Sequence, residues 1–118
     1  MDGTAMTDQW TDRNWGRYRV LVEKPGYKVK ELEIAPHRQL SMQRHQHRSE
    51  HWYVLNGEIA MTTEWQGSRD RFRIAALSHG YTVGVGVWHQ ASNLTDETVS
   101  IIEIQYGDVC TEEDIERR

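Results

Sequence analysis

The sequence has little of several residue types that mark other classes of protein. It contains one cysteine, Cys110, so no disulfide can form within the chain. It contains only two prolines, and no stretch approaches the roughly 20 apolar residues that a membrane span needs. Lysine and arginine number 14 against 18 acidic residues, which gives a net charge of −4 and argues against general nucleic-acid binding.

The start of the chain also lacks the features of a signal peptide. Residues 1–10 are polar and contain two aspartates but no apolar run. Together with the lone cysteine, this predicts a reduced, cytoplasmic location. A chain of 118 residues has room for one hydrophobic core. We therefore expect an N-terminal arm over residues 1–12 and one domain over residues 13–118.

What the sequence has is a series of short runs of β-branched and aromatic residues separated by turn residues. This pattern predicts strands at 17–23, 27–35, 40–47, 50–55, 58–65, 71–77, 81–87 and 98–105. Asn56-Gly57 is a strong hairpin signal, and a slip of the apolar phase between Val29 and Leu32 predicts a bulge. Residues 111–118 read as a short C-terminal helix. The fold class is all-β, either a closed barrel or a double-sheet jelly roll.

Three of the six histidines lie within seven positions of one another. On a strand, His45 and His47 would share one face with Gln43, because side chains repeat every two residues. A turn at residues 48–49 would bring Glu50 back toward the same interior. Nitrogen and oxygen donors that converge in this way are what a divalent metal requires. His89, far along the chain, is placed to complete the set, whereas His37, His51 and His79 read as ordinary surface or packing histidines.

At these residues the sequence resembles the cupin superfamily. The first cupin motif ends in a glutamate, six residues and a glycine, as Glu50 and Gly57 do here, and its two earlier ligand positions fall at Gln43 and His45. The second motif is matched by Gly86-x2-His89-x3-Asn93, but its first half is degraded.

Residues 43–52 are most similar to the type II phosphomannose isomerases, and the resemblance extends over about residues 13–116. Two positions depart from that family. Asn14 replaces a proline before Trp15-Gly16, and Gly84-Val85-Gly86 replaces Pro-Pro-Gly before Trp88-His89. Because glycine is less constrained than proline, the loop before His89 is expected to hold its site less tightly.

The resemblance implies a single-domain cupin, that is, a double-stranded β-helix or jelly-roll barrel. It also implies a metal-dependent isomerase that interconverts mannose 6-phosphate and fructose 6-phosphate. The implied ligands of the divalent ion (Zn, Co, Mn, Ni or Mg) are Gln43, His45, Glu50 and His89. The guanylyltransferase domain that accompanies this domain in the family is absent, and no glycine-rich phosphate loop precedes a helix, so nucleotidyl transfer is not expected.

Further residues are assigned roles as hypotheses. His47 and Arg48 are the candidate catalytic residues: His47 for proton transfer, since imidazole titrates near neutral pH, and Arg48 for contact with phosphate or sugar. His47 is also open to a role as a metal ligand, a substrate contact or a rim residue. Substrate contacts are assigned to Lys28, Lys30, Trp52 and Trp88. A solvated strand face is the alternative for the cations, and packing is the alternative for the tryptophans.

Two other functions compete with the isomerase. One is a non-catalytic cupin that binds a sugar or serves a regulatory role, which the degraded second motif favours. The other is a metal-dependent oxygenase, in which His47 would act as a third histidine ligand. We expect a small-molecule sugar phosphate as partner, no nucleic acid and no membrane. The resemblance implies a homodimer, because cupins often pair through strand exchange or sheet packing. The arginines at 69, 71 and 73 share one strand face, which suits a subunit interface or solvent.

Overall fold

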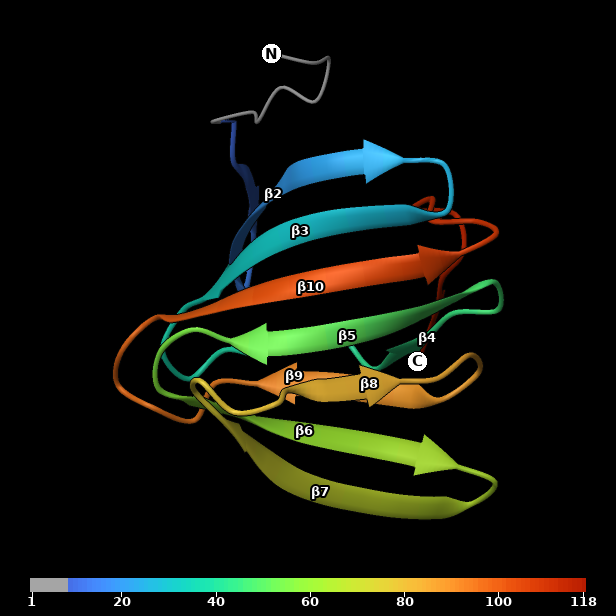
Figure 1. Ribbon diagram of the computed structural model, residues 1–118. Helices are drawn as coiled ribbons and strands as arrows, with labels where there is room; N and C mark the ends of the chain where they lie inside the picture. Colours follow the sequence, from blue (N-terminus) through green and yellow to red (C-terminus); the bar gives the residue numbers. More distant parts are fainter. Residues whose placement is uncertain (1–8) are drawn as a thin grey trace.

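The computed structural model describes residues 9–118, and within this range the chain forms eleven strands and no helix. The strands wrap into two layers (Figure 1). They are β1 (Thr11–Arg13), β2 (Gly16–Lys24), β3 (Tyr27–Ile34), β4 (Gln43–Arg44), β5 (Arg48–Val54), β6 (Glu58–Trp65), β7 (Ser68–Ala75), β8 (Tyr81–Val83), β9 (Trp88–Ser92), β10 (Val99–Gly107) and β11 (Glu116–Arg117).

The strands form two antiparallel sheets. The first has the order β1-β2-β3-β10-β5-β8, and the second has the order β11-β4-β9-β6-β7. Consecutive strands change sheets repeatedly, as in a jelly roll, so the inner faces of both sheets enclose one interior. The apolar core lies between them, with Ile34, Met61 and Ile101 fully buried. The expected all-β jelly roll is confirmed.

Strand register explains how polar residues reach this interior. Directly paired residues of antiparallel strands point to the same face. Lys30 pairs with Glu103, which pairs with Trp52, so these three form one inward row across β3, β10 and β5. Two residues further along, Gln105 pairs with Glu50 in the neighbouring inward row. One end of the jelly roll therefore has a polar interior.

The same register corrects the predicted bulge between Val29 and Leu32. Strand β3 alternates without a slip, because Lys28 and Lys30 occupy buried positions in phase with Leu32. The irregularity lies instead in β2, between Val20 and Val22. Lysine at an inward position looks like a phase change in a sequence pattern that counts only apolar residues.

The hairpin predicted at Asn56-Gly57 was wrong. Gly57 does take a positive φ of 68°, but the Asn56-Gly57 turn joins β5 in one sheet to β6 in the other, so it makes a corner between sheets. The two-residue hairpin turn follows β6: Gln66 and Gly67 have φ values of 51° and 80°, as a type I′ turn requires.

The segment that was expected to be one strand over 40–47 contains only the two-residue strand β4. The expected turn at 48–49 is wrong as well, because Arg48 begins β5 and the bend lies at residues 46 and 47. This earlier bend ends the strand alternation before His47, which is exposed while His45 is buried.

The expected C-terminal helix over 111–118 is also wrong. Residues 111–114 form a turn, and Glu116–Arg117 pair with β4 as strand β11. Thr111 and the acidic residues after it do not cap a helix. They form hydrogen bonds and ion pairs with residues that lie far away in the sequence.

Part of the expected N-terminal arm is described. Thr11 and Asp12 belong to β1, which pairs with β2, while residues 1–8 lie outside the described residues. Across the described part of the chain, no helical segment has the length and hydrophobicity to cross a membrane.

Candidate metal centre and cavity

Three buried side chains meet at the polar end of the jelly roll. His45 lies in the loop between β4 and β5, Glu50 on β5 and His89 on β9, so two strands from different sheets and one loop contribute. Each is at most 2% exposed, and their ligand atoms lie within 4.8 Å of one another. The sequence prediction that these three residues converge is confirmed.

The hydrogen bonds of the two imidazoles fix which nitrogen faces the cluster. Nδ1 of His45 lies 2.7 Å from the backbone carbonyl oxygen of Asp114, and Nδ1 of His89 lies 3.0 Å from that of Val87. A carbonyl oxygen only accepts hydrogen bonds, so in the neutral rings each Nδ1 carries the proton and each Nε2 carries a lone pair. This arrangement prepares histidine for metal binding.

Each Nε2 lone pair then faces a carboxylate oxygen of Glu50. The His45 Nε2 to Glu50 Oε2 distance is 3.0 Å, and the His89 Nε2 to Glu50 Oε1 distance is 3.2 Å. His89 Nε2 is buried and makes no hydrogen bond to any described residue. Acceptors that face one another at these distances repel unless a proton or a metal ion lies between them. Two imidazoles and one carboxylate are a donor set that suits a divalent transition metal, so these residues fit the implied ion.

Glu50 is held by two further donors. Arg48 Nε donates to Oε2 at 3.0 Å, and Trp52 Nε1 donates to Oε1 at 3.2 Å. Burial opposes the charge on this carboxylate, but hydrogen bonds from His45 and His89, when their Nε2 atoms carry a proton, hold the pKa of Glu50 well below its usual range. A carboxylate in its ionised form is also what a metal ion requires as a ligand.

The expected fourth ligand, Gln43, lies on the same face as His89, since the two residues are paired across β4 and β9. Its amide nitrogen is 3.3 Å from the Ser41 hydroxyl oxygen and 3.4 Å from the Ser41 carbonyl oxygen. Gln43 therefore lies beside the cluster, and its role as a ligand stays a prediction.

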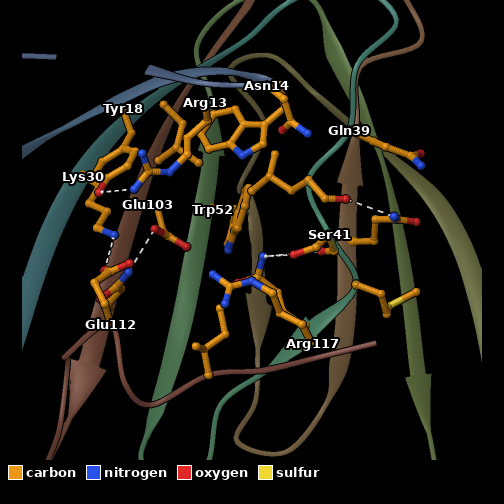
Figure 2. Close-up of a pocket in the computed structure, with 18 of the residues that line it drawn as sticks. Arg13, Asn14, Tyr18, Lys30, Gln39, Ser41, Trp52, Glu103, Glu112 and Arg117 are labelled. Atoms are coloured by element: carbon orange, nitrogen blue, oxygen red, sulfur yellow. Dashed lines mark hydrogen bonds and ion pairs between the residues drawn. The ribbon is translucent and has the colours of Figure 1, made fainter. Parts of the chain in front are cut away.

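A cavity of about 590 Å³ opens next to the cluster (Figure 2). Arg48 and Trp52 line it and both contact Glu50, so the cluster lies directly behind the cavity wall. Other polar residues that line it include Arg13, Asn14, Lys30, Gln43, Glu103, Gln105, Glu112, Arg117 and Arg118. A cavity with several cations, amides and one buried carboxyl group suits a small anionic, hydroxylated molecule.

Glu103 is the site residue that the sequence reasoning passed over. It is 6% exposed, lies in the cavity wall and accepts a hydrogen bond from Gln105 Nε2 at 3.1 Å. Burial and the nearby charge of Glu50 raise the pKa of Glu103 well above its usual range. The signal was present as Glu103-x-Gln105 within an apolar strand, where a polar residue at every second position marks a polar face.

The remaining predicted residues divide into two groups. Arg48, Lys30 and Trp52 line the cavity as expected. The other three, His47, Lys28 and Trp88, do not line it.

Each of these three has a different location. His47 is exposed on the bend before β5. Lys28 is buried, with its ammonium 3.4 Å from Glu23. The Trp88 ring stacks between two guanidinium groups, 4.7 Å from that of Arg44 and 4.4 Å from that of Arg118. Trp88 therefore packs on the outer side of the second sheet. This agrees with packing, the alternative to a substrate contact that the sequence left open for this residue.

The sequence comparison decides the family. Residues 3–118 match the family described as mannose-6-phosphate isomerase C-terminal. This chain belongs to that family. The chain is 30% identical over 106 residues to mannose-1-phosphate guanylyltransferase 2 of Escherichia coli O157:H7, covering 90% of this chain and 21% of that protein. It is also 30% identical to the alginate biosynthesis protein AlgA of Pseudomonas aeruginosa, covering 89% and 21%. The chain thus spans about a fifth of the length of the curated relatives it matches.

Solved structures support the cupin fold of this family member. The capsular polysaccharide assembling protein CapF from Staphylococcus aureus superposes with a TM-score of 0.84 at 13% identity, over 98% of this chain and 32% of that chain. Oxalate decarboxylase from Bacillus subtilis superposes with a TM-score of 0.81 at 14% identity, over 98% and 33%. At such identities the likeness concerns the fold alone.

Proposed function

We propose that this family member is a metal-dependent isomerase that interconverts mannose 6-phosphate and fructose 6-phosphate. The observation that carries the proposal is the arrangement of His45, Glu50 and His89, whose lone pairs and carboxylate face one another directly behind a cationic cavity. The family to which the chain belongs is described by this activity, and relatives are named for reactions of mannose 1-phosphate.

The reaction moves a proton between two neighbouring carbon atoms. A base removes the proton from C2 of the open-chain aldose, an enediol forms between C1 and C2, and a proton returns at C1. The hydroxyl proton of O2 passes to O1, so the ketose is an isomer with no atom gained or lost. The site must therefore stabilise charge on two oxygens, supply a proton-transfer group and hold the phosphate.

Glu50, His45 and His89, together with Gln43, are the residues that would hold the ion. A divalent ion bound there supplies Lewis-acid stabilisation of negative charge on sugar oxygens. With Glu50 as the only anionic ligand, the centre keeps a net positive charge, which favours this electrophilic role over the redox chemistry of the oxygenase alternative.

Glu103 takes the place of His47 as the candidate for proton transfer. His47 is exposed and outside the cavity wall, whereas the Glu103 carboxyl group is buried in that wall beside Gln105. A proton-transfer group must come within hydrogen-bond reach of the sugar carbon, and among these two residues only Glu103 lies where a bound sugar would be.

Two arginines are the candidates for the phosphate. The cavity cations Lys30 and Arg48 are already paired, with Glu112 at 2.7 Å and Glu50 at 3.0 Å. Arg13 and Arg117 also line the cavity, and no carboxylate of the described residues lies within ion-pair distance of either one. They come from β1 and β11 and appear at opposite sides of the labelled group in Figure 2. A sugar phosphate spanning the cavity would bring its phosphate to one of them and its C1–C2 end toward Glu103.

The test is an isomerase assay on the purified chain after chelator treatment, with mannose 6-phosphate and added divalent metals. We expect metal-dependent formation of fructose 6-phosphate, lost in His45→Ala and Glu50→Gln and retained in the surface control Arg38→Gln. A folded, metal-binding chain without turnover would reject the isomerase and favour the sugar-binding alternative. Oxygen uptake with an iron-loaded chain would favour the oxygenase.

The location and the assembly stay proposals. We propose a cytoplasmic location, because sugar phosphates are intracellular metabolites, and a homodimer. Arg69, Arg71 and Arg73 are exposed along β7, the edge strand of the second sheet, which is a place where a second copy could pair.

A further inference from the structure

The segment over residues 111–118, here called the C-terminal strap, contacts the metal-centre region at each step along its length. It follows β10 of the first sheet and ends in β11 of the second sheet. The Thr111 carbonyl oxygen accepts a hydrogen bond from Arg48, and Glu112 pairs with Lys30. Glu116 pairs with Arg44 at the far end. The strap therefore covers the loop that carries His45.

Asp114 makes the central contacts of the strap. Its two carboxylate oxygens accept hydrogen bonds from the backbone N–H groups of Gln46 and His47, each at 2.9 Å. Its own carbonyl oxygen accepts the hydrogen bond from His45 Nδ1 at 2.7 Å. Asp114 is 8% exposed, so these bonds are shielded from water. One residue thus holds three consecutive positions of the loop.

The loop has little else to hold it. Residues 45–47 lie between β4 and β5, outside both sheets, so the N–H groups of Gln46 and His47 have no ladder partner. On the other side, the His45 carbonyl accepts one hydrogen bond from the Gly86 N–H at 2.8 Å. Without Asp114, the loop would lose two backbone hydrogen bonds and the carbonyl that sets the His45 ring.

We propose that Asp114 is a positioning residue for the metal centre: its carboxylate fixes the 45–47 loop while its carbonyl fixes the tautomer and orientation of His45. The inference rests on the metal site of the proposed function but not on the sugar substrate. The strap is then part of the metal centre, although none of its side chains belongs to the cluster of His45, Glu50 and His89. Groups that orient a metal-binding histidine affect metal affinity strongly when they are altered.

The experiment compares zinc affinity in Asp114→Asn and Glu116→Gln by competition with a coloured chelator. An asparagine side chain has one oxygen to accept an N–H, and its NH₂ group would face the second N–H donor. We expect Asp114→Asn to weaken zinc binding roughly 10–100-fold. Glu116→Gln is the matched control, because it also removes one strap carboxylate, but one that contacts only the side chains of Arg44 and Gln46. Its zinc affinity should stay unchanged.

A second measurement uses the unaltered chain, so that the inference does not depend on a variant that folds. Because coupling is reciprocal, zinc should slow hydrogen exchange of the Gln46 and His47 amides. The Ser100 amide is the internal reference, since it is capped in the same manner by Asn56 at 2.8 Å and lies outside the loop.

The outcomes separate the two proposals. Unchanged zinc affinity in a folded Asp114→Asn, or equal losses in both variants, would overturn the positioning role. If zinc slowed hydrogen exchange of the Ser100 amide as much as that of the Gln46 and His47 amides, the positioning role would also be overturned. A chain that binds zinc but shows no isomerase activity would overturn the proposed reaction and leave the positioning role standing. A chain that binds no divalent metal would overturn both.

Discussion

The Nδ1 atom of His45 lies 2.7 Å from the backbone carbonyl oxygen of Asp114, a residue 69 positions further along the chain. This bond joins a candidate metal ligand in the first half of the sequence to the strap at the end of the described chain. It leaves the Nε2 lone pair of His45 directed at Glu50, where the lone pair of His89 also points. The candidate metal centre therefore depends on contacts from distant parts of the chain: Asp114 holds the His45 ring, and Val87 holds the His89 ring.

The first prediction separates the two neighbouring histidines. We expect His45→Ala to abolish high-affinity binding of zinc or cobalt, because it removes one of three buried ligands. His47→Ala should bind metal and turn over substrate as the wild type does, since His47 is exposed and uses only its backbone N–H to contact Asp114. Calorimetric titration with metal and the isomerase assay check both. If metal binding and turnover were lost equally in the two variants, His47 would have to be counted among the residues of the site.

A second prediction concerns the phosphate. Arg117→Gln should raise the KM for mannose 6-phosphate by about 10- to 100-fold, which corresponds to the loss of one charge-assisted hydrogen bond of about 1.5–3 kcal/mol. The kcat should change much less, because Arg117 acts on binding and not on the proton transfer.

Steady-state kinetics with Arg38→Gln as the control would check this prediction. Arg38 is exposed between β3 and β4 and does not line the cavity, so this substitution should leave both constants unchanged. A KM that stays at the wild-type value in Arg117→Gln would assign the phosphate to another cation, with Arg13 the next to test.

A third prediction distinguishes the proton-transfer group. Glu103→Gln keeps the size of the side chain but removes the carboxyl group that lines the cavity. We expect kcat to fall by about 10²–10⁴-fold, the usual contribution of a positioned acid or base, while the KM changes little. Stopped assays against the wild type check this, and zinc affinity measured in parallel shows whether the metal centre remains intact. A kcat within a few-fold of the wild-type value would exclude Glu103 from proton transfer.

A fourth prediction assigns a structural role to the asparagine of the second cupin motif. Asn93 is fully buried and donates to the carbonyl oxygens of Ile34, Ala35 and Glu97 while it accepts two bonds from Thr95. Asn93→Ala should reduce the free energy of unfolding by about 2–4 kcal/mol, because buried backbone groups lose their partner. Urea unfolding measures this. Zinc affinity of the folded fraction should stay unchanged, and a parallel loss of affinity would contradict a purely structural role.

A fifth prediction follows from the pKa of a half-buried carboxylate, Glu64, and of an exposed one, Glu116. Hydrogen bonds from Arg118 lower the pKa of Glu64, and those from Arg44 lower that of Glu116, both from an ordinary value of 4.5. A carboxylate whose folded pKa lies below its unfolded pKa stabilises the fold above the unfolded value, and this contribution is lost as the pH falls through the folded value.

The double variant Glu64→Gln and Glu116→Gln should therefore have a lower Tm than the wild type at pH 7, and the difference should become smaller as the pH falls below 4.5. Thermal unfolding by circular dichroism over a series of pH values from 7 downward checks this sign. A Tm difference that does not change with pH would show that the two side chains act through packing and not through charge.

The sequence by itself determined the fold class and the core of the candidate metal centre. The period of two along the strands identified an all-β chain, the short spacing from His45 to Glu50 identified two residues that meet, and the resemblance to the second cupin motif added His89. Strand alternation and the short spacing are local signals, because they depend on neighbouring residues.

Only the tertiary structure decided which residues surround that core. The bend before Arg48 turned His47 outward, cross-strand pairing placed Glu103 between Lys30 and Trp52, and the strap brought Asp114 onto the His45 loop. The expected helix at residues 111–118 failed for the same reason, because its polar residues bond to distant partners in place of their own backbone. Contacts between residues that are 50 to 80 positions apart depend on strand register, which the local pattern of polar and apolar residues does not record.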